Sequence, residues 1–224
     1  MADNAVKGTR PITATNTPFN ALSYMIETQV KGLINTALPV RVDSVDGNGV
    51  GPVGYVSVTP LVTQKDGDGN SIEPQQIPRI PYARVQGGKA ALIIDPQPGD
   101  IGIAIFAQQD ISSLTTGTTT PVTPGSFRSF DVSDGMYIGG ILNSEPQIYI
   151  ELKNDNTAKI YASSSITLES ENVTVNATLT TINGDMTING QLTTTGDQIG
   201  EGISLKNHKH TGVQTGSGET GPPA

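Results

Sequence analysis

Ile182-Asn-Gly-Asp-Met186 and Ile188-Asn-Gly-Gln-Leu192 superpose at a shift of six residues, and this repeat decides the fold expected for the C-terminal part of the chain. Glycines keep the same spacing at Gly184, Gly190, Gly196 and Gly202. Strands this short cannot build a hydrophobic core within one chain. Two arrangements remain: coils of one chain stack as a β-helix, or several chains intertwine and each contributes one face of a shared prism.

The surrounding region, residues 148 to 205, favours the intertwined arrangement. Its apolar residues alternate in short runs that bury one face each, at Ile148/Ile150/Leu152, Ala158/Ile160/Ala162, Ile166/Leu168, Val173/Val175 and Met186/Ile188. The spacing of these runs varies too much for regular coils of a single chain. We therefore predict an intertwined trimeric, triple-stranded β-helix, because threefold symmetry is the simplest cyclic closure.

Residues 39 to 145 predict a small β-barrel such as an OB-fold, with a sandwich as the alternative. The expected strands and turns are Val40–Val45, Tyr55–Val58, a hairpin tip at Lys65–Asn70, and Ala90–Ile94 with Ile101–Phe106 on either side of a turn at Pro96–Asp100. A stretch of Thr, Gly, Pro and Ser from residue 112 to 127 is typical of a long exposed loop. Residues 131 to 140 then return to the barrel.

One amphipathic helix precedes the barrel. Thr17 is a suitable N-cap and Pro18 fits the first helical position. The apolar residues follow at helical spacing, at Phe19, Leu22, Ile26, Val30, Leu33 and Ala37, and Pro39 is expected to end the helix. Residues 1 to 16 are polar and predict a flexible arm. The apolar stripe needs a surface, so we expect the helix to pack on the barrel or on a partner.

The composition excludes several functions. Charged residues make up 15 % of the chain, with 26 Gly and 15 Pro, which favours short strands and turns, so the fold class is all-β apart from this helix. The net charge of −8 and the lack of a basic run argue against nucleic-acid binding. There is no cysteine for a disulfide, a thiolate nucleophile or a Cys-ligated zinc site. The chain has no apolar stretch of membrane-spanning length, and we expect a soluble product made in the cytoplasm.

No catalytic constellation stands out either. The carboxylate pairs Asp43/Asp46 and Asp66/Asp68 lie among Gly and Asn and are typical of turns. The glycines match no phosphate-binding motif, and the serines match no nucleophile-elbow motif. We therefore predict that the protein is not an enzyme.

The two histidines of the chain, His208 and His210, are candidate metal ligands. Residues two apart on an extended segment project to the same side. One chain supplies two imidazoles, but three chains that meet on an axis supply six nitrogens, enough for an octahedral first-row metal such as Fe²⁺, with nickel and cobalt also suitable. The alternative is a pair of solvated histidines in a polar tail.

These features together point to a family. The helix, the five-strand barrel, Pro98-Gly-Asp-Ile-Gly102, Gly125-Ser-Phe-Arg-Ser-Phe-Asp-Val-Ser-Asp-Gly-Met-Tyr-Ile-Gly139, the β-prism and the terminal His208-Lys-His210 resemble the central spike of contractile-tailed bacteriophages. These spikes are the membrane-puncturing proteins at the baseplate tip. The resemblance extends over nearly the whole chain from about Pro18. It departs from the larger spikes because no segment could hold a lysozyme domain.

The resemblance implies a homotrimer with four parts. Residues 1–38 would form an arm and helix, 39–145 an OB-fold collar, 146–205 a triple-stranded β-helix shaft, and 206–224 a metal-binding apex. In the family the paired histidines, here His208 and His210, hold one iron ion (Fe²⁺) per trimer on the threefold axis. The implied partners are the baseplate hub and tail tube proteins and, transiently, the host outer membrane. The implied location is the tip of the tail baseplate in the virion.

Two other functions stay open at this point. A trimeric β-prism with an OB-fold could be a carbohydrate- or receptor-binding module of the tail, although its distal part has no aromatic platform. A single-chain β-helix could degrade polysaccharides, but this needs clustered acid and base residues.

Overall fold

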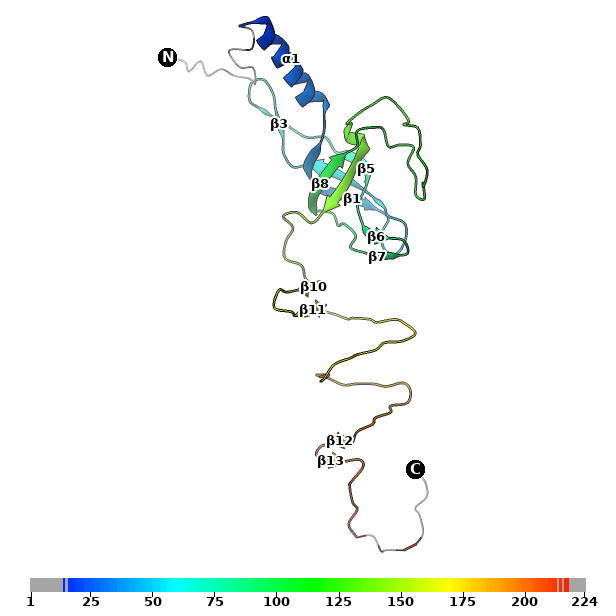
Figure 1. Ribbon diagram of the computed structural model, residues 1–224. Helices are drawn as coiled ribbons and strands as arrows, with labels where there is room; N and C mark the ends of the chain where they lie inside the picture. Colours follow the sequence, from blue (N-terminus) through cyan, green and yellow to red (C-terminus); the bar gives the residue numbers. More distant parts are fainter. Residues whose placement is uncertain (1–13, 15, 213, 215, 218–224) are drawn as a thin grey trace, which may run out of the picture. The chain divides into compact units, whose positions relative to one another are not determined.

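The structure is a computed structural model that describes residues 14, 16–212, 214, 216 and 217 (Figure 1). It is mostly β with one N-terminal helix, as predicted. The chain divides into two compact units, Met1–Ser164 and Ser165–Ala224. Most of the predicted N-terminal arm, residues 1–13 and 15, lies outside the described residues. Within the described part, no helix has the length and hydrophobicity of a membrane span.

Helix α1 spans Pro18–Leu33 and begins where its capping residues predict. Thr17 has an extended backbone, and its side-chain oxygen accepts a hydrogen bond from the Asn20 amide at 3.1 Å. An ion pair between Glu27 and Lys31 adds a few tenths of a kcal/mol on the solvated side. We expected the apolar stripe of α1 to pack either on the barrel or on a partner. No residue of α1 is buried, so the stripe does not pack on the half-barrel described below.

The helix ends at Leu33, and the prediction that it continues to Pro39 is wrong. The reason is that the next residues join the sheet: Ala37 pairs with Ile105 and Pro39 with Ile103 in an antiparallel ladder. The Phe106 amide also donates to the Thr36 carbonyl at 3.2 Å. Ala37, which the helical spacing had placed in the helix, is therefore part of a strand.

Five antiparallel strands form the main sheet. They are β1 (Ala37–Asp46), β2 (Tyr55–Pro60), β5 (Ile77–Pro81), β8 (Ile101–Phe106) and β9 (Gly135–Gly139), in the order β5-β2-β1-β8-β9. The sheet curls so that its two edges approach each other. Tyr82, just after β5, forms a parallel bridge with Tyr137 of β9, and the Ala83 amide donates to the Tyr137 carbonyl at 2.7 Å. The result is a curled five-strand half-barrel (Figure 1).

The core of the half-barrel lies inside this curl. Its members alternate along the strands with residues that are partly buried or exposed, and they are Val40, Val42, Val56, Val58, Ile77, Ile80, Tyr82, Ala104, Phe106 and Tyr137. Fully burying one such aliphatic side chain contributes about 1.5–3 kcal/mol. Gly102 is required here, because a Cβ at this position would lie 2.6 Å from the Tyr137 ring. The glycine therefore makes room for the largest fully buried side chain of the core.

Two short hairpins lie outside the main sheet. Strands β3 (Gln64–Lys65) and β4 (Ser71–Ile72) form the first, and β6 (Val85–Gly87) and β7 (Ala90–Leu92) form the second. The first confirms the predicted hairpin tip, where the Asp66 carboxylate accepts from the Asp68 and Asn70 amides. A 3-10 turn, η2 (Val132–Asp134), precedes β9.

The predicted turn at residues 96–100 is present, with the Asp100 amide donating to the Gln97 carbonyl at 3.0 Å, but the strands on either side of it do not pair with each other. Strand β7 pairs with β6 rather than with β8, and β8 lies between β1 and β9. The turn packs against β1 instead: the Val42 amide donates to the Asp100 carbonyl and the Gly99 amide donates to the Val42 carbonyl, both at 2.8 Å. These non-local bonds hold the turn against the main sheet.

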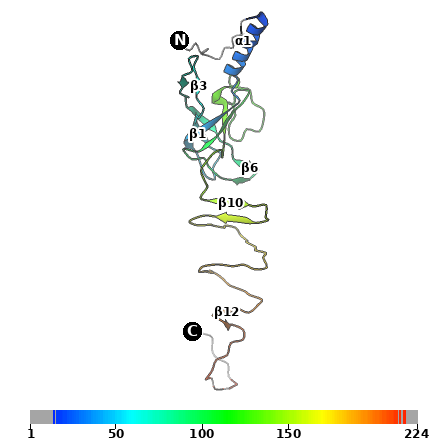
Figure 2. The ribbon, with the colours of Figure 1, turned by 90° about the vertical axis from the view of Figure 1, so that its left-hand side faces the viewer.

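After the half-barrel, β10 (Tyr149–Leu152) and β11 (Ala158–Tyr161) form an antiparallel hairpin within the first unit (Figure 2). The rings of Tyr149 and Tyr161 stack with their centroids 5.3 Å apart. Ile150 and Ile160 face each other across the pair, and both stay exposed. The first two predicted runs of this region are therefore strands, but they bury no core by themselves.

The second unit contains two short strands, β12 (Ile199–Gly200) and β13 (Ile203–Ser204). Residues 165–198 form no strand pairs in the single chain, although they include the predicted runs. Their large apolar side chains are all exposed, at Ile166, Leu168, Val173, Val175, Leu179, Ile182, Met186, Ile188 and Leu192. One chain therefore does not stack these residues into coils, and the triple-stranded β-helix stays a prediction.

Candidate functional site

The predicted metal ligands follow the β12–β13 hairpin. The Leu205 amide donates to the Gln198 carbonyl at 2.7 Å, and the Lys206 amide donates to the Asp197 carboxylate at 3.0 Å. The chain then turns back, because the His208 amide donates to the Ser204 carbonyl at 3.0 Å. These backbone bonds tie the first histidine to the hairpin.

The structure brings His208 and His210 together. Their ring centroids are 5.1 Å apart and the ring planes stand at 79°. Nδ1 of His208 lies 3.1 Å from the Ser204 carbonyl oxygen and 3.0 Å from the Leu205 carbonyl oxygen. A carbonyl can only accept, so Nδ1 carries the hydrogen of the neutral ring and Nε2 keeps its lone pair. Metal-binding histidines are held in this way by a second partner on the other ring nitrogen.

One chain brings together two candidate metal ligands, His208 and His210. Among the described residues, no group of three or more His, Asp or Glu side chains could hold a metal ion. Two neutral imidazoles suit iron, nickel or cobalt, but further ligands must come from elsewhere. The residues present therefore fit a metal that is shared between chains. Lys206 and Lys209 are exposed, so their charges can stay in water.

Apolar side chains lie directly before the histidines. Ile199, Ile203 and Leu205 line an open hollow together with His208, and all three are more than 60 % exposed. Such side chains gain free energy when other apolar groups cover them. The exposed apolar side chains therefore favour association between chains, and the two histidines need further chains to complete a set of metal ligands.

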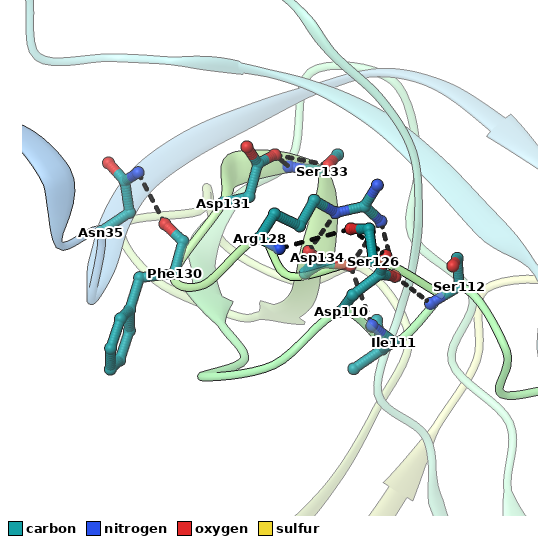
Figure 3. A network of polar contacts seen from close by, with 10 residues as sticks. All are labelled: Asn35, Asp110, Ile111, Ser112, Ser126, Arg128, Phe130, Asp131, Ser133 and Asp134. Carbon is teal, nitrogen blue, oxygen red and sulfur yellow. Dashed lines mark hydrogen bonds and ion pairs between the residues drawn. The ribbon is translucent and has the colours of Figure 1, made fainter. Parts of the chain in front are cut away.

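A second polar cluster lies at the long loop of the half-barrel (Figure 3). Arg128 Nε donates to Asp134 at 2.7 Å, and an Arg128 terminal nitrogen donates to Asp110 at 2.8 Å and to Asp134 at 2.9 Å. Asp134 is fully buried and Asp110 nearly so. Ser126 Oγ donates to Asp110 at 2.7 Å, and the Ile111 amide donates to Asp134 at 3.0 Å. The cluster joins the two ends of the loop to the half-barrel.

Electrostatics favour the charged forms of Asp110 and Arg128. Hydrogen bonds from Ser112 and Ser126, together with the charge of Arg128, lower the pKa of Asp110 to about 2. The hydrogen bond to Asp134 and the charges of the surrounding aspartates raise the pKa of Arg128. These bonds and charges fix the position of the loop.

Sequence reasoning missed this cluster. Arg128 and Asp110 stand 18 residues apart, and Asp110 and Ser126 stand 16 apart, so no local spacing indicates their contact. The loop of residues 112–127 was expected to be long and exposed. It has no helix or strand, but both of its ends are anchored. Gly125 also permits this anchoring, because a Cβ there would lie 2.4 Å from Ser112 Oγ.

The comparisons with known proteins bear on the C-terminal segment. Residues 202–224 match the family model described as GpV Apex motif. The match confirms the resemblance to phage tail spikes and identifies this segment as the apex motif of a gpV-like spike. It includes both histidines, while residues 213, 215 and 218–224 lie outside the described part. A search of curated proteins found no match. The apex motif indicates a structural, tail-tip spike role.

Proposed function

We propose that this protein is the central spike of a contractile phage tail and pierces the host outer membrane mechanically when the tail contracts. The observation that carries the proposal is the match of residues 202–224 to the apex motif of gpV-type spikes. In this proposal the collar and helix face the baseplate hub and tail tube proteins, and the apex leads. The exposed apolar stripe of α1 offers the hub a surface.

The proposed trimer rests on the exposed apolar runs of residues 146–205. A soluble protein rarely exposes so many large apolar side chains along a continuous segment. If two further copies cover these side chains, each Å² of apolar surface removed from water stabilises the assembly by about 25 cal/mol. Intertwined strands also leave no long free edges and spread an axial load over many backbone hydrogen bonds.

The proposed apex site is one iron ion held by His208 and His210 of three copies. Three chains supply six imidazole nitrogens, which complete an octahedron. His208 is already oriented by its bonds to the Ser204 and Leu205 carbonyls. The ion would act as a structural clip, and because it binds the assembled form alone it adds to the stability of that form.

The charge of the shaft supports a mechanical entry. Residues 148–205 contain seven carboxylates against two lysines, a net charge of −5 for each chain. Three copies carry about −15, which anionic lipid surfaces repel rather than attract. Membrane passage must then be driven by an external force, and tail contraction supplies one.

The proposal is tested with particles that carry a spike lacking residues 202–224. Such particles should infect intact cells poorly but should infect host cells stripped of their outer membrane almost normally. Electron microscopy must show equal numbers of complete baseplates in both preparations. An equal defect on both kinds of cell would contradict outer-membrane piercing. Saturable adsorption of the isolated protein to intact cells would favour a binding module instead.

A further inference from the structure

A cavity of about 390 Å³ opens at the half-barrel beside the β6–β7 hairpin. Its apolar lining includes Val85, Leu92, Ile94 and Ile138, and all four side chains are between 44 and 75 % exposed. The volume lies in the range of sites that hold a ligand or a side-chain cluster. Apolar walls that face water in this way indicate a surface that is covered in the working protein.

Two buried hydrogen-bond donors belong to residues that line this cavity. Arg84 Nε and Tyr137 Oη are buried and have no partner among the described residues. The other groups of Arg84 are satisfied, since its terminal nitrogens donate to the Gly51 carbonyl at 2.9 Å and to Asp95 at 3.0 Å. Burial raises the pKa of Tyr137 to about 12, so its hydroxyl stays neutral and can donate. Neither atom is accessible to water in the single chain, so an occupant with acceptor oxygens would satisfy them once the surrounding side chains shift.

The charge of the lining limits the chemistry of the occupant. Asp95 pairs with Arg84, and Asp100 adds a further carboxylate. The site therefore has a net negative charge and disfavours an anion. A neutral group with an apolar body and carbonyl acceptors fits, and a stretch of polypeptide has this composition.

Leu142 is a suitable anchor for such a stretch. It is 87 % exposed and has a φ of +53°, a conformation that residues with a side chain rarely adopt. It follows Gly139 and Gly140 and precedes Asn143, and these three neighbours line the cavity. Each chain thus has an exposed leucine close to its own cavity, and the side chain of this leucine does not line that cavity.

We propose that Leu142 of one copy inserts into the cavity of the next copy and locks neighbouring collars together. The inference rests on the proposed trimer. Residues 139–143 lead from the half-barrel into the segment that would wind around the threefold axis, so the copies of this segment meet near that axis. Each cavity borders the same segment and therefore faces a neighbour's Leu142.

The test uses the absence of cysteine from the chain. Full-length L142C and L92C chains with different tags are co-expressed and oxidised. A disulfide between the two tagged forms should link most of the mixed assemblies. The matched control replaces L92C by V62C, because Val62 is 63 % exposed but does not line the cavity. Equal crosslinking in both mixtures would overturn the inference.

A second measurement avoids the cysteines. In L142G the glycine accepts the positive φ, so the half-barrel itself should be unharmed. Amide exchange of residues 85–92 should become about tenfold faster, whereas V62G should leave it unchanged; unchanged exchange in L142G would overturn the inference. The mass of each sample by light scattering separates the two proposals. A trimer without the crosslink contradicts the inference alone, and a monomer contradicts the proposed function as well.

Discussion

The half-barrel and residues 146–205 have the same alternation of apolar and polar residues, but only the half-barrel buries its apolar side chains within one chain. In the half-barrel, alternate apolar residues of β1, β2 and β5 point into one interior, and Val40, Val58 and Ile80 have no exposed surface. In residues 146–205 the apolar side chains stay exposed in the single chain. A period of two therefore predicts a strand with one buried face, but not whether the same chain supplies the cover.

The largest expected effect comes from separating the two regions. A chain of residues 1–145 should be a folded monomer, because its core is complete. Residues 146–224 should show β-sheet circular dichroism only as a trimer, because their apolar faces have no cover within one chain. Light scattering and far-UV circular dichroism over a dilution series check both. A stable monomer of residues 146–224 with a full β signal would remove the basis of the comparison.

A large-to-small substitution in the core should have the next largest effect. I80A should lower the free energy of unfolding by about 2–5 kcal/mol, since the side chain is fully buried and leaves a cavity. The control V62A changes an exposed side chain and should cost less than about 0.5 kcal/mol. Urea unfolding of the residue 1–145 fragment measures both. A similar cost for the two variants would mean that the half-barrel alone is not cooperatively folded.

Acid should weaken the half-barrel through its loop cluster. The pKa of Asp110 is lowered in the folded state, so its contribution is present above the unfolded value of 3.8 and is lost as the pH falls toward about 2. Urea midpoints of the wild type should therefore fall between pH 4.5 and pH 2. D110N should show a shallower fall over the same range, although it is less stable at pH 7. Parallel pH profiles would show that Asp110 does not carry this dependence.

The smallest effect on assembly is expected at the apex. H208A/H210A should abolish a metal content of about one iron per three chains but leave the trimer intact, because the shaft buries most of the shared surface. K209A is the matched control and should keep the metal. Acid should release the metal from the wild type, because protonation takes the ligating lone pair. Elemental analysis with mass measurement checks this, and full metal in the double variant would contradict the proposed ligands.

Local signals predicted the local parts of this fold well. The Thr17 cap, the Asp66 turn and the strand at Ile101–Phe106 depend on neighbouring residues, and the structure has each of them. Contacts between distant residues account for the errors. The helix ends before Pro39 because Ala37 pairs with Ile105, and the turn at residues 96–100 was predicted but its packing on Val42 was not.

The candidate site shows the same limit. The spacing of His208 and His210 is local, and the structure places their rings side by side as expected. The Arg128 cluster and the two unpartnered donors of the cavity arise from folding, because burial decides which atoms lose their water. The spacing of residues along the chain does not predict which atoms lose contact with water.

The stacked tyrosines of the β10–β11 hairpin have a spectroscopic consequence. The chain has no tryptophan, and no aromatic residue follows Tyr161. Near-ultraviolet ellipticity therefore arises from the residues up to this hairpin, where two phenol rings 5.3 Å apart couple their transitions. The last 63 residues are transparent in that band but absorb in the amide band. The near-ultraviolet melting curve reports on the residues up to Tyr161, whereas the amide-band curve reports on the whole chain. A difference between their midpoints therefore shows that the last 63 residues melt at a different temperature from the rest.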